Sequence, residues 1–128
     1  MKQKRLPSSG YSLHPRVRML CGTAIAFGPG KSDLLEALQR TGSITKAAGQ
    51  MGMSYMRAWT LIRTMNRCFS EPLVMAIRGG TKGGGGAALT ETGREVLTLY
   101  RRMEHKSVSI VQPDWKKFQK LLKKGLKK

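Results

Sequence analysis

The chain has 128 residues, which is enough for one domain of ordinary size with short tails. It carries 24 lysines and arginines against 7 aspartates and glutamates, so its formal net charge is +17. A charge of this size opposes compaction by self-repulsion unless a polyanion neutralises it, which indicates nucleic acid or an anionic membrane surface as the partner. No apolar run approaches the roughly 18 residues that span a bilayer, and the basic N-terminus is not followed by a long apolar stretch. We therefore expect neither a membrane protein nor a signal peptide.

Cysteine and histidine usage argues against metal binding and catalysis. Cys21 and Cys68 lie in apolar stretches, without histidine or cysteine at the spacing of metal ligands, and are expected to be free thiols in a reducing cytosol. Neither His14 nor His105 has a nucleophile and a carboxylate nearby in sequence. We expect a cytoplasmic protein that is not an enzyme and uses no cofactor or metal.

Composition divides the chain into three parts. Residues 1–15 are polar and basic and are expected to form a flexible arm. Residues 16–108 carry the apolar periodicity of one folded domain, and residues 109–128 form a lysine-rich tail.

The domain is expected to begin with a strand and a helix. The apolar run over 17–27 predicts one strand, which the following glycines and proline end. A helix is expected from Lys31 to Arg40, with Ser32 or Asp33 as its N-cap.

The next segment has the apolar spacing of a helix-turn-helix. Gly42 closes the preceding helix, Ser43 caps the next one, Gly52 makes the sharp turn, and Ser54 caps a longer helix to about Phe69. Apolar residues recur at helical spacing in both helices: Ile44, Ala47, Ala48, Met51, Ala58, Leu61, Ile62 and Met65. The opposite face of the second helix is polar and basic, which is typical of a helix that enters the major groove.

A glycine-rich turn follows between two short apolar runs. Residues 73–77 and 87–89 are expected to be antiparallel strands joined by this turn. A helix-turn-helix followed by such a hairpin is a winged helix, so the predicted fold is mainly α with a small antiparallel β wing. The strand over 17–27 could complete the same sheet.

Thr90 is expected to cap a last core helix to about Lys106, and Pro113 to separate it from the tail. The apolar side of this helix either closes the core or forms a dimer seam. We favour a homodimer through the helix 90–106, because two recognition helices about 34 Å apart read a palindrome. The tail could bind phosphates, form a basic amphipathic helix on a membrane or a partner, or stay unstructured; we favour phosphate binding.

Twelve residues are the candidate contacts with double-stranded DNA. We expect phosphate contacts from one end of the first helix of the pair, namely from Ser43, Thr45 and Lys46. We expect base contacts from the start of the second helix, namely from Ser54, Tyr55, Met56, Arg57 and Thr60, with Arg63 nearer the backbone. We expect groove contacts from the wing turn, namely from Arg78, Thr81 and Lys82. The alternatives are a solvated basic face and a hairpin loop without contacts.

The residues Gly28 to Ser32 resemble the end of a nucleotide-binding P-loop. The full motif requires a glycine five residues before Gly30, where this chain has Ile25, and Pro29 removes a backbone donor. We therefore expect a turn and a helix start here, with no nucleotide.

From Gly28 to Glu104 the sequence resembles the N-terminal DNA-binding domain of ModE, the molybdate-responsive regulators, which is similar to the winged helices of LysR-type regulators. The resemblance rests on Gly28–Lys31, Thr41–Ile44, Ala47–Ala48, Met51–Tyr55, Ala58–Trp59, Met65–Asn66, Gly79–Gly80, Gly83–Ala87, Leu89–Thr90 and Gly93. It implies a homodimeric cytoplasmic transcription factor, a packing role for Trp59, and dimerisation through the last core helix. ModE proteins that sense molybdate carry C-terminal oxyanion-binding domains, whereas about twenty residues follow the core here, so we expect no small-molecule effector for this chain.

These features together predict a sequence-specific transcriptional regulator that binds duplex DNA as a homodimer. One alternative is an architectural protein that coats DNA with little sequence preference, which the excess charge favours. Another is a winged helix that binds protein, with the tail as its docking peptide.

Overall fold

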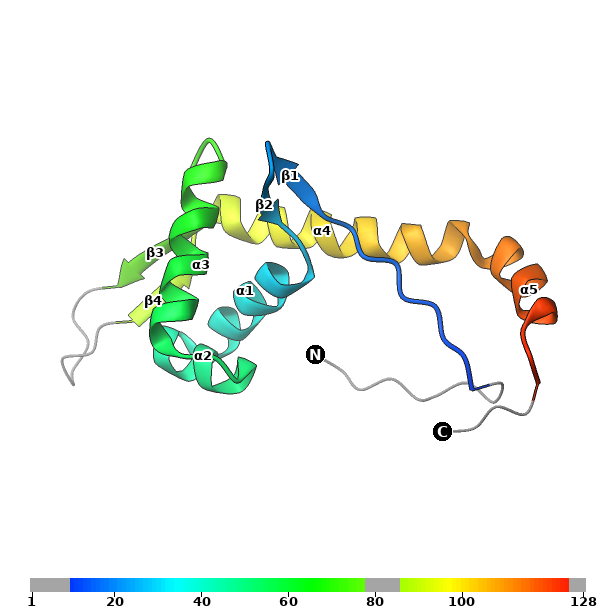
Figure 1. The fold of residues 1–128 in the computed structure, drawn as a ribbon. Coiled ribbons are helices and arrows are strands. Elements are labelled where there is room, and N and C mark those ends of the chain that lie inside the picture. The colour runs from blue at the N-terminus through cyan, green and yellow to red at the C-terminus, as the bar shows by residue number, and fades with distance from the viewer. Residues whose placement is uncertain (1–9, 78–85, 125–128) are drawn as a thin grey trace.

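The computed structural model describes residues 10–77 and 86–124. Its elements in chain order are β1 (Met19–Cys21), β2 (Ala24–Phe27), α1 (Pro29–Thr41), α2 (Ile44–Met51), α3 (Tyr55–Cys68), β3 (Val74–Ile77), β4 (Gly86–Leu89), α4 (Glu91–Ile110) and α5 (Gln112–Leu121). Helix α4 forms a spine of about 30 Å. Helices α1–α3 and the strands β3 and β4 gather along its N-terminal half, and α5 turns away at its far end (Figure 1).

The helix-turn-helix forms as the apolar spacing predicts. The alanines Ala47, Ala48 and Ala58 are buried where α2 and α3 meet, and their small side chains allow the two helices to approach closely. Gly42 and Gly52 end α1 and α2 with φ angles of 69° and 70°, which confirms the two predicted turns.

Both predicted N-caps of the pair are confirmed. The Ser43 hydroxyl oxygen accepts a hydrogen bond from the backbone N–H of Lys46 at 3.1 Å, and that of Ser54 accepts one from Arg57 at 3.0 Å. Each cap satisfies one of the free N–H groups in the first turn of its helix.

The predicted start of α1 was wrong. The helix begins at Pro29, after Gly28 in an extended conformation, and no side chain caps it. Proline favours this first position because its φ angle is already helical and its missing N–H would have no partner there. The Ser32 hydroxyl donates to the Pro29 carbonyl at 2.8 Å, while Asp33 pairs with Arg101.

The single strand predicted over 17–27 was also wrong. Gly22 has a φ angle of 65° and reverses the chain, so that β1 and β2 pair as an antiparallel hairpin. The pairing of β1 with β2 and of β3 with β4 gives two separate two-stranded sheets. The N-terminal hairpin therefore does not complete the sheet of the wing.

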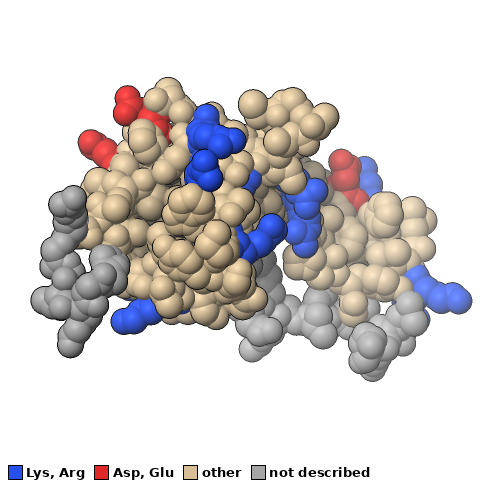
Figure 2. All heavy atoms as spheres, turned by 60° about the vertical axis from the view of Figure 1, so that its left-hand side comes forward, with Lys and Arg blue, Asp and Glu red and all other residues tan. Residues whose placement is uncertain are grey.

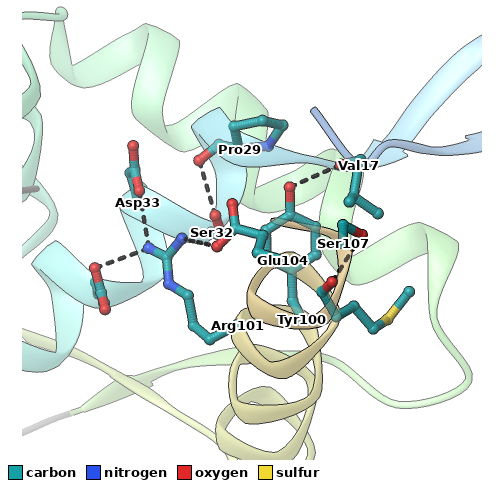
Figure 3. Close-up of polar contacts among 10 residues, drawn as sticks. Val17, Pro29, Ser32, Asp33, Tyr100, Arg101, Glu104 and Ser107 are labelled. Atoms are coloured by element: carbon teal, nitrogen blue, oxygen red, sulfur yellow. Dashed lines mark hydrogen bonds and ion pairs between the residues drawn. The ribbon is translucent and has the colours of Figure 1, made fainter. Parts of the chain in front are cut away.

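Helix α4 is longer than predicted and packs against the N-terminal part of the chain. It continues past Lys106 to Ile110, and Pro113 lies in the first turn of α5 instead of between the helices. Tyr100 is buried beneath Phe27 at 5.1 Å between ring centroids, and its hydroxyl donates to the Val17 carbonyl at 2.7 Å (Figure 3). Burial and, to a lesser extent, the nearby Glu104 carboxylate together raise the pKa of Tyr100 to about 12, so this hydroxyl stays a donor.

A four-residue ion cluster fixes α1 on α4. The Arg101 guanidinium binds Asp33 and Glu36 of α1 at 2.8 Å each, and Glu104 of its own helix at 2.9 Å (Figure 3). Partial burial opposes the charge of Arg101, but the hydrogen bonds with the three carboxylates outweigh it and raise the pKa of the guanidinium. The helix-turn-helix is thus held in one orientation on α4.

Candidate nucleic-acid interface

Helix α3 presents one continuous exposed face. Ala58, Ile62 and Met65 are buried on its inner side. The side chains on the outer side are exposed, and they are Tyr55, Met56, Arg57, Trp59, Thr60, Arg63 and Arg67. The five residues predicted to read bases (Ser54, Tyr55, Met56, Arg57 and Thr60) are therefore all accessible at the start of this helix. Met56 is 62% exposed, so its side chain is available for contacts outside the domain.

The residues predicted to contact phosphates lie at the start of α2. Thr45 and Lys46 are exposed, whereas Ser43 is half-buried. The Ser43 hydroxyl oxygen is engaged as the helix cap, and its O–H can still donate. The positive end of the α2 dipole adds to the charge of Lys46 at this place.

The charged side chains around these helices are mainly basic. Lys and Arg side chains are spread over the face drawn in Figure 2, and the acidic side chains lie along its upper edge. The carboxylates of Asp33, Glu36 and Glu104 gather around Arg101 where α1 meets α4, and the chain as a whole still carries a formal net charge of +17. The excess positive charge is thus available to a polyanion.

Trp59 departs from the packing role that the resemblance implies. Its ring is 38% exposed on the outer side of α3, and the Arg63 guanidinium carbon lies 5.0 Å from the ring centroid. A cation–π contact of this kind holds the guanidinium against the helix surface and narrows its range of positions. Helical spacing alone could have revealed this pair, because residues four apart lie one above the other.

The wing is described at its strands. Strands β3 and β4 pair from Val74 opposite Leu89 to Ile77 opposite Gly86, which confirms the predicted hairpin. The predicted contacts Arg78, Thr81 and Lys82 lie outside the described residues. The N–H of Ala87 donates to the Gly42 carbonyl at 3.0 Å, and a Cβ on Gly86 would lie 2.8 Å from that same oxygen. Glycine at 86 therefore lets β4 approach the turn between α1 and α2.

Lys31, the lysine of the P-loop-like segment, serves packing. It is buried, and its ammonium donates to the Ile25 carbonyl of β2. Burial lowers the pKa of Lys31, and the charge of Arg57 nearby acts in the same direction, whereas Cys68 raises it. Its ammonium is directed at a backbone carbonyl of the adjacent strand.

The structure also has a concave region to which α3 does not contribute. A cavity of about 460 Å³ opens between the segment 13–16, the start of α1 and the second half of α4. Its acidic wall residues, Asp33 and Glu104, are both bound to Arg101. Across residues 10–77 and 86–124, no group of three or more His, Cys, Asp and Glu side chains could hold a metal ion, and no helix has the length and apolarity to cross a membrane.

Comparison with known proteins agrees with this geometry. Residues 32–94 match the family described as bacterial regulatory helix-turn-helix protein, lysR family. The molybdenum transport protein ModE of Azotobacter vinelandii is 48% identical over 83 residues, which cover 65% of this chain and 30% of that protein. The DNA-binding transcriptional dual regulator ModE of Escherichia coli (strain K12) is 36% identical over 89 residues, which cover 67% of this chain and 34% of that protein.

A third relative has a different printed name. The molybdenum-pterin-binding protein MopB of Rhodobacter capsulatus is 42% identical over 82 residues, and the match covers 64% of this chain and 30% of that protein. The matched part thus spans about a third of the length of these relatives. The lysR family consists of transcription regulators and not of enzymes. Residues 32–94 thus form a helix-turn-helix domain of this family, and the chain is ModE-like over this DNA-binding domain.

Proposed function

We propose that this domain binds duplex DNA sequence-specifically, as a homodimer, and thereby regulates transcription in the cytoplasm. The observation that carries the proposal is the outer face of α3, where Tyr55, Met56, Arg57 and Thr60 are all exposed at the start of a helix whose other side is buried. A helix of this kind fits the major groove, where base edges differ between all four base pairs.

Each group of predicted contacts has its own task in this proposal. Arg57 reads a guanine, because a guanidinium can pair bidentately with its O6 and N7 atoms. Ser54, Tyr55, Met56 and Thr60 contact the neighbouring base edges, and Arg63, steered by Trp59, binds a phosphate. Ser43, Thr45 and Lys46 bind phosphates at one end of α2, and the wing residues Arg78, Thr81 and Lys82 reach along an adjacent groove.

The dimer is proposed to form along α4. An apolar stripe runs along this helix on a side that its own domain does not cover. Leu99 and Met103 are 45% and 43% exposed, Ile110 is 78% exposed, and the partly buried Val96 continues the stripe toward the N-terminus. The intervals of three, four and seven residues are those of a helix–helix seam. A twofold axis would place the same stripe of a second copy against it, as a palindromic site requires.

Arg57→Ala tests the assignment of base reading to α3. We expect it to cost about 1–3 kcal/mol of binding free energy on the preferred sequence and to relax the preference at one base pair of each half-site. Competition binding with single-base variants of the site measures both effects. Arg40→Ala is the matched control, because Arg40 lies at the end of α1 and donates to Gln50 at 2.7 Å. If Arg57→Ala discriminates between sequences as the wild type does, base reading does not reside at Arg57.

The tail is proposed to add phosphate contacts. Helix α5 and the next residue, Leu122, form an apolar side on which Trp115 stacks on Phe118. The other sides of α5 carry lysines. Removal of residues 116–128 is expected to weaken binding to all sequences equally and to flatten the dependence of log Kd on log salt by about one unit per lost contact. Titrations at several salt concentrations measure the slope. The triple variant Lys116→Gln, Lys117→Gln and Lys120→Gln controls for loss of the helix itself. An unchanged slope in both variants would mean that the tail does not touch DNA.

A further inference from the structure

Helix α3 reaches the wing through one side chain in its second half. The Asn66 carbonyl oxygen accepts hydrogen bonds from the N–H groups of Leu73 and Val74 at 2.8 and 3.2 Å, and the Asn66 amide nitrogen donates to the Val74 carbonyl at 3.2 Å. The orientation of the amide follows from its partners, because two backbone donors require the oxygen and one backbone acceptor requires the NH₂ group. Asn66 thus forms three hydrogen bonds with Leu73 and Val74, where β3 begins.

The same short segment is held from its other side by α4. The Thr90 hydroxyl donates to the Pro72 carbonyl at 2.7 Å, and the Thr90 N–H donates to the Leu73 carbonyl at 2.9 Å. Residues 72–74 are therefore the joint at which the recognition helix, the wing and the proposed dimerisation helix meet. Thr90 fixes this joint to α4, and Asn66 fixes it to α3.

We infer that Asn66 is a positioning residue, which sets the wing at one distance and angle from the base-reading end of α3. This inference rests on the proposed function, in which α3 occupies the major groove and the wing contacts the flanking DNA. A strand rises about 3.3 Å per residue, so the four residues of β3 form a lever of about 13 Å. A rotation of about 10° at the joint would then displace the far end of the strand by about 2 Å. Such a displacement is enough to break a hydrogen bond to a phosphate.

The alternative role for Asn66 is only to satisfy the N–H groups of a buried turn. Both roles predict a loss of stability on substitution, so stability alone cannot separate them. They differ in what happens on the DNA. A positioning residue affects the contacts of the wing more than those of α3, whereas a purely stabilising residue lowers the folded fraction and weakens every contact alike.

The test compares Asn66→Leu with the wild type by hydroxyl-radical footprinting on a selected DNA site. Leucine has a similar size but forms no hydrogen bonds, so Asn66→Leu is expected to keep protection and base preference at the positions read by α3. Protection of the flanking DNA should disappear. The affinity should fall by about tenfold, the effect of losing a single charge-assisted hydrogen bond. On a duplex trimmed of its flanks, wild type and variant should bind equally.

Two further variants make the result decisive. Asn66→Asp keeps the acceptors for Leu73 and Val74 and loses the donor, so its flanking protection should be intermediate even if Asn66→Leu fails to fold. Ile62→Val is the control for stability, because it thins the core beneath α3 without removing any of the hydrogen bonds of Asn66 at the joint. The inference would be overturned if the Asn66 variants lost protection equally at the positions read by α3 and at the flanking DNA, as is expected for Ile62→Val. It would also be overturned if protection of the flanking DNA were unchanged. A wild type without a footprint on any selected site would instead refute the proposed function.

Discussion

Gly93→Ala is expected to lower the free energy of unfolding by about 1–3 kcal/mol, although alanine favours a helix more than glycine does. Gly93 lies in the first turn of α4, and it is buried against the joint at residues 72–74. A Cβ at this position would lie 2.1 Å from the Leu73 carbonyl oxygen and 3.0 Å from the carbonyl carbon. Both atoms belong to the backbone, so a side-chain rotation cannot relieve the overlap.

The overlap would push α4 and the start of β3 apart. The hydrogen bonds from Thr90 to Pro72 and Leu73 span this interface, so they would lengthen together. The gain in helix propensity is about 1 kcal/mol and is smaller than the cost of separating the two backbones. Because the same interface sets the wing, DNA affinity should fall along with stability.

Gly49→Ala is the matched control for this prediction. Gly49 also lies inside a helix, but nothing lies within 4 Å of where its Cβ would be. We expect this variant to gain about 0.5–1 kcal/mol of stability from propensity alone. Thermal and denaturant unfolding of both variants measure the two effects. If Gly93→Ala proves as stable as Gly49→Ala, the close approach of α4 to residue 73 is not present in the protein.

If the proposed dimer forms along α4, Met103→Asp is expected to convert it into monomers and to reduce affinity for a palindromic site by about 100-fold or more, since two linked half-sites bind with an effective concentration that a monomer lacks. Met103 lies between Leu99 and Ile110 in the exposed stripe of α4. A carboxylate there would face its own copy across the twofold axis, in a seam from which water is excluded. Burying two like charges without partners costs far more than one apolar contact contributes.

The measurement combines sedimentation with DNA binding. His105→Asp is the control, because it introduces the same group two residues further along α4, at an exposed position outside the stripe. We expect His105→Asp to stay dimeric and to bind the palindrome almost as the wild type does. Met103→Asp should retain weak binding to a single half-site. A variant that remains dimeric would show that α4 is not the seam.

Local rules predict the elements whose signals are short in range. The caps at Ser43, Ser54 and Thr90 and the turns at Gly42 and Gly52 each depend on one residue and its immediate neighbours, and all of them form as expected. The paired helices and the two wing strands also form as their apolar spacing predicts, because each element buries one side.

Elements that depend on tertiary contacts were not predicted. An apolar run interrupted by Gly22 fits a strand with a defect as well as a hairpin, and only the packing of the hairpin on α1 and α3 decides between them. Helix α1 begins two residues before its expected start, because Pro29 is the first helical residue and not the end of a turn. Asn66 carries no local signal, since its partners lie seven and eight residues away.

The candidate contacts with DNA follow from the sequence only in part. Helical periodicity assigns Arg57 and Thr60 to the outer face of α3, and their exposure agrees with that assignment. Helical spacing places Arg63 one turn after Trp59, but it does not tell how far the tryptophan is covered, so the exposure of this pair emerges only from the packed structure. The bases and phosphates that these residues contact remain predictions.

The most direct test of the central claim is selection of binding sites from a random duplex pool, with the purified protein at physiological salt. A dimer that reads bases through α3 predicts a palindromic consensus, with half-sites one helical turn apart and a guanine in each half-site whose importance Arg57→Ala removes. A pool without enrichment, despite tight and salt-sensitive binding, would contradict the account and indicate a protein that coats DNA without reading it.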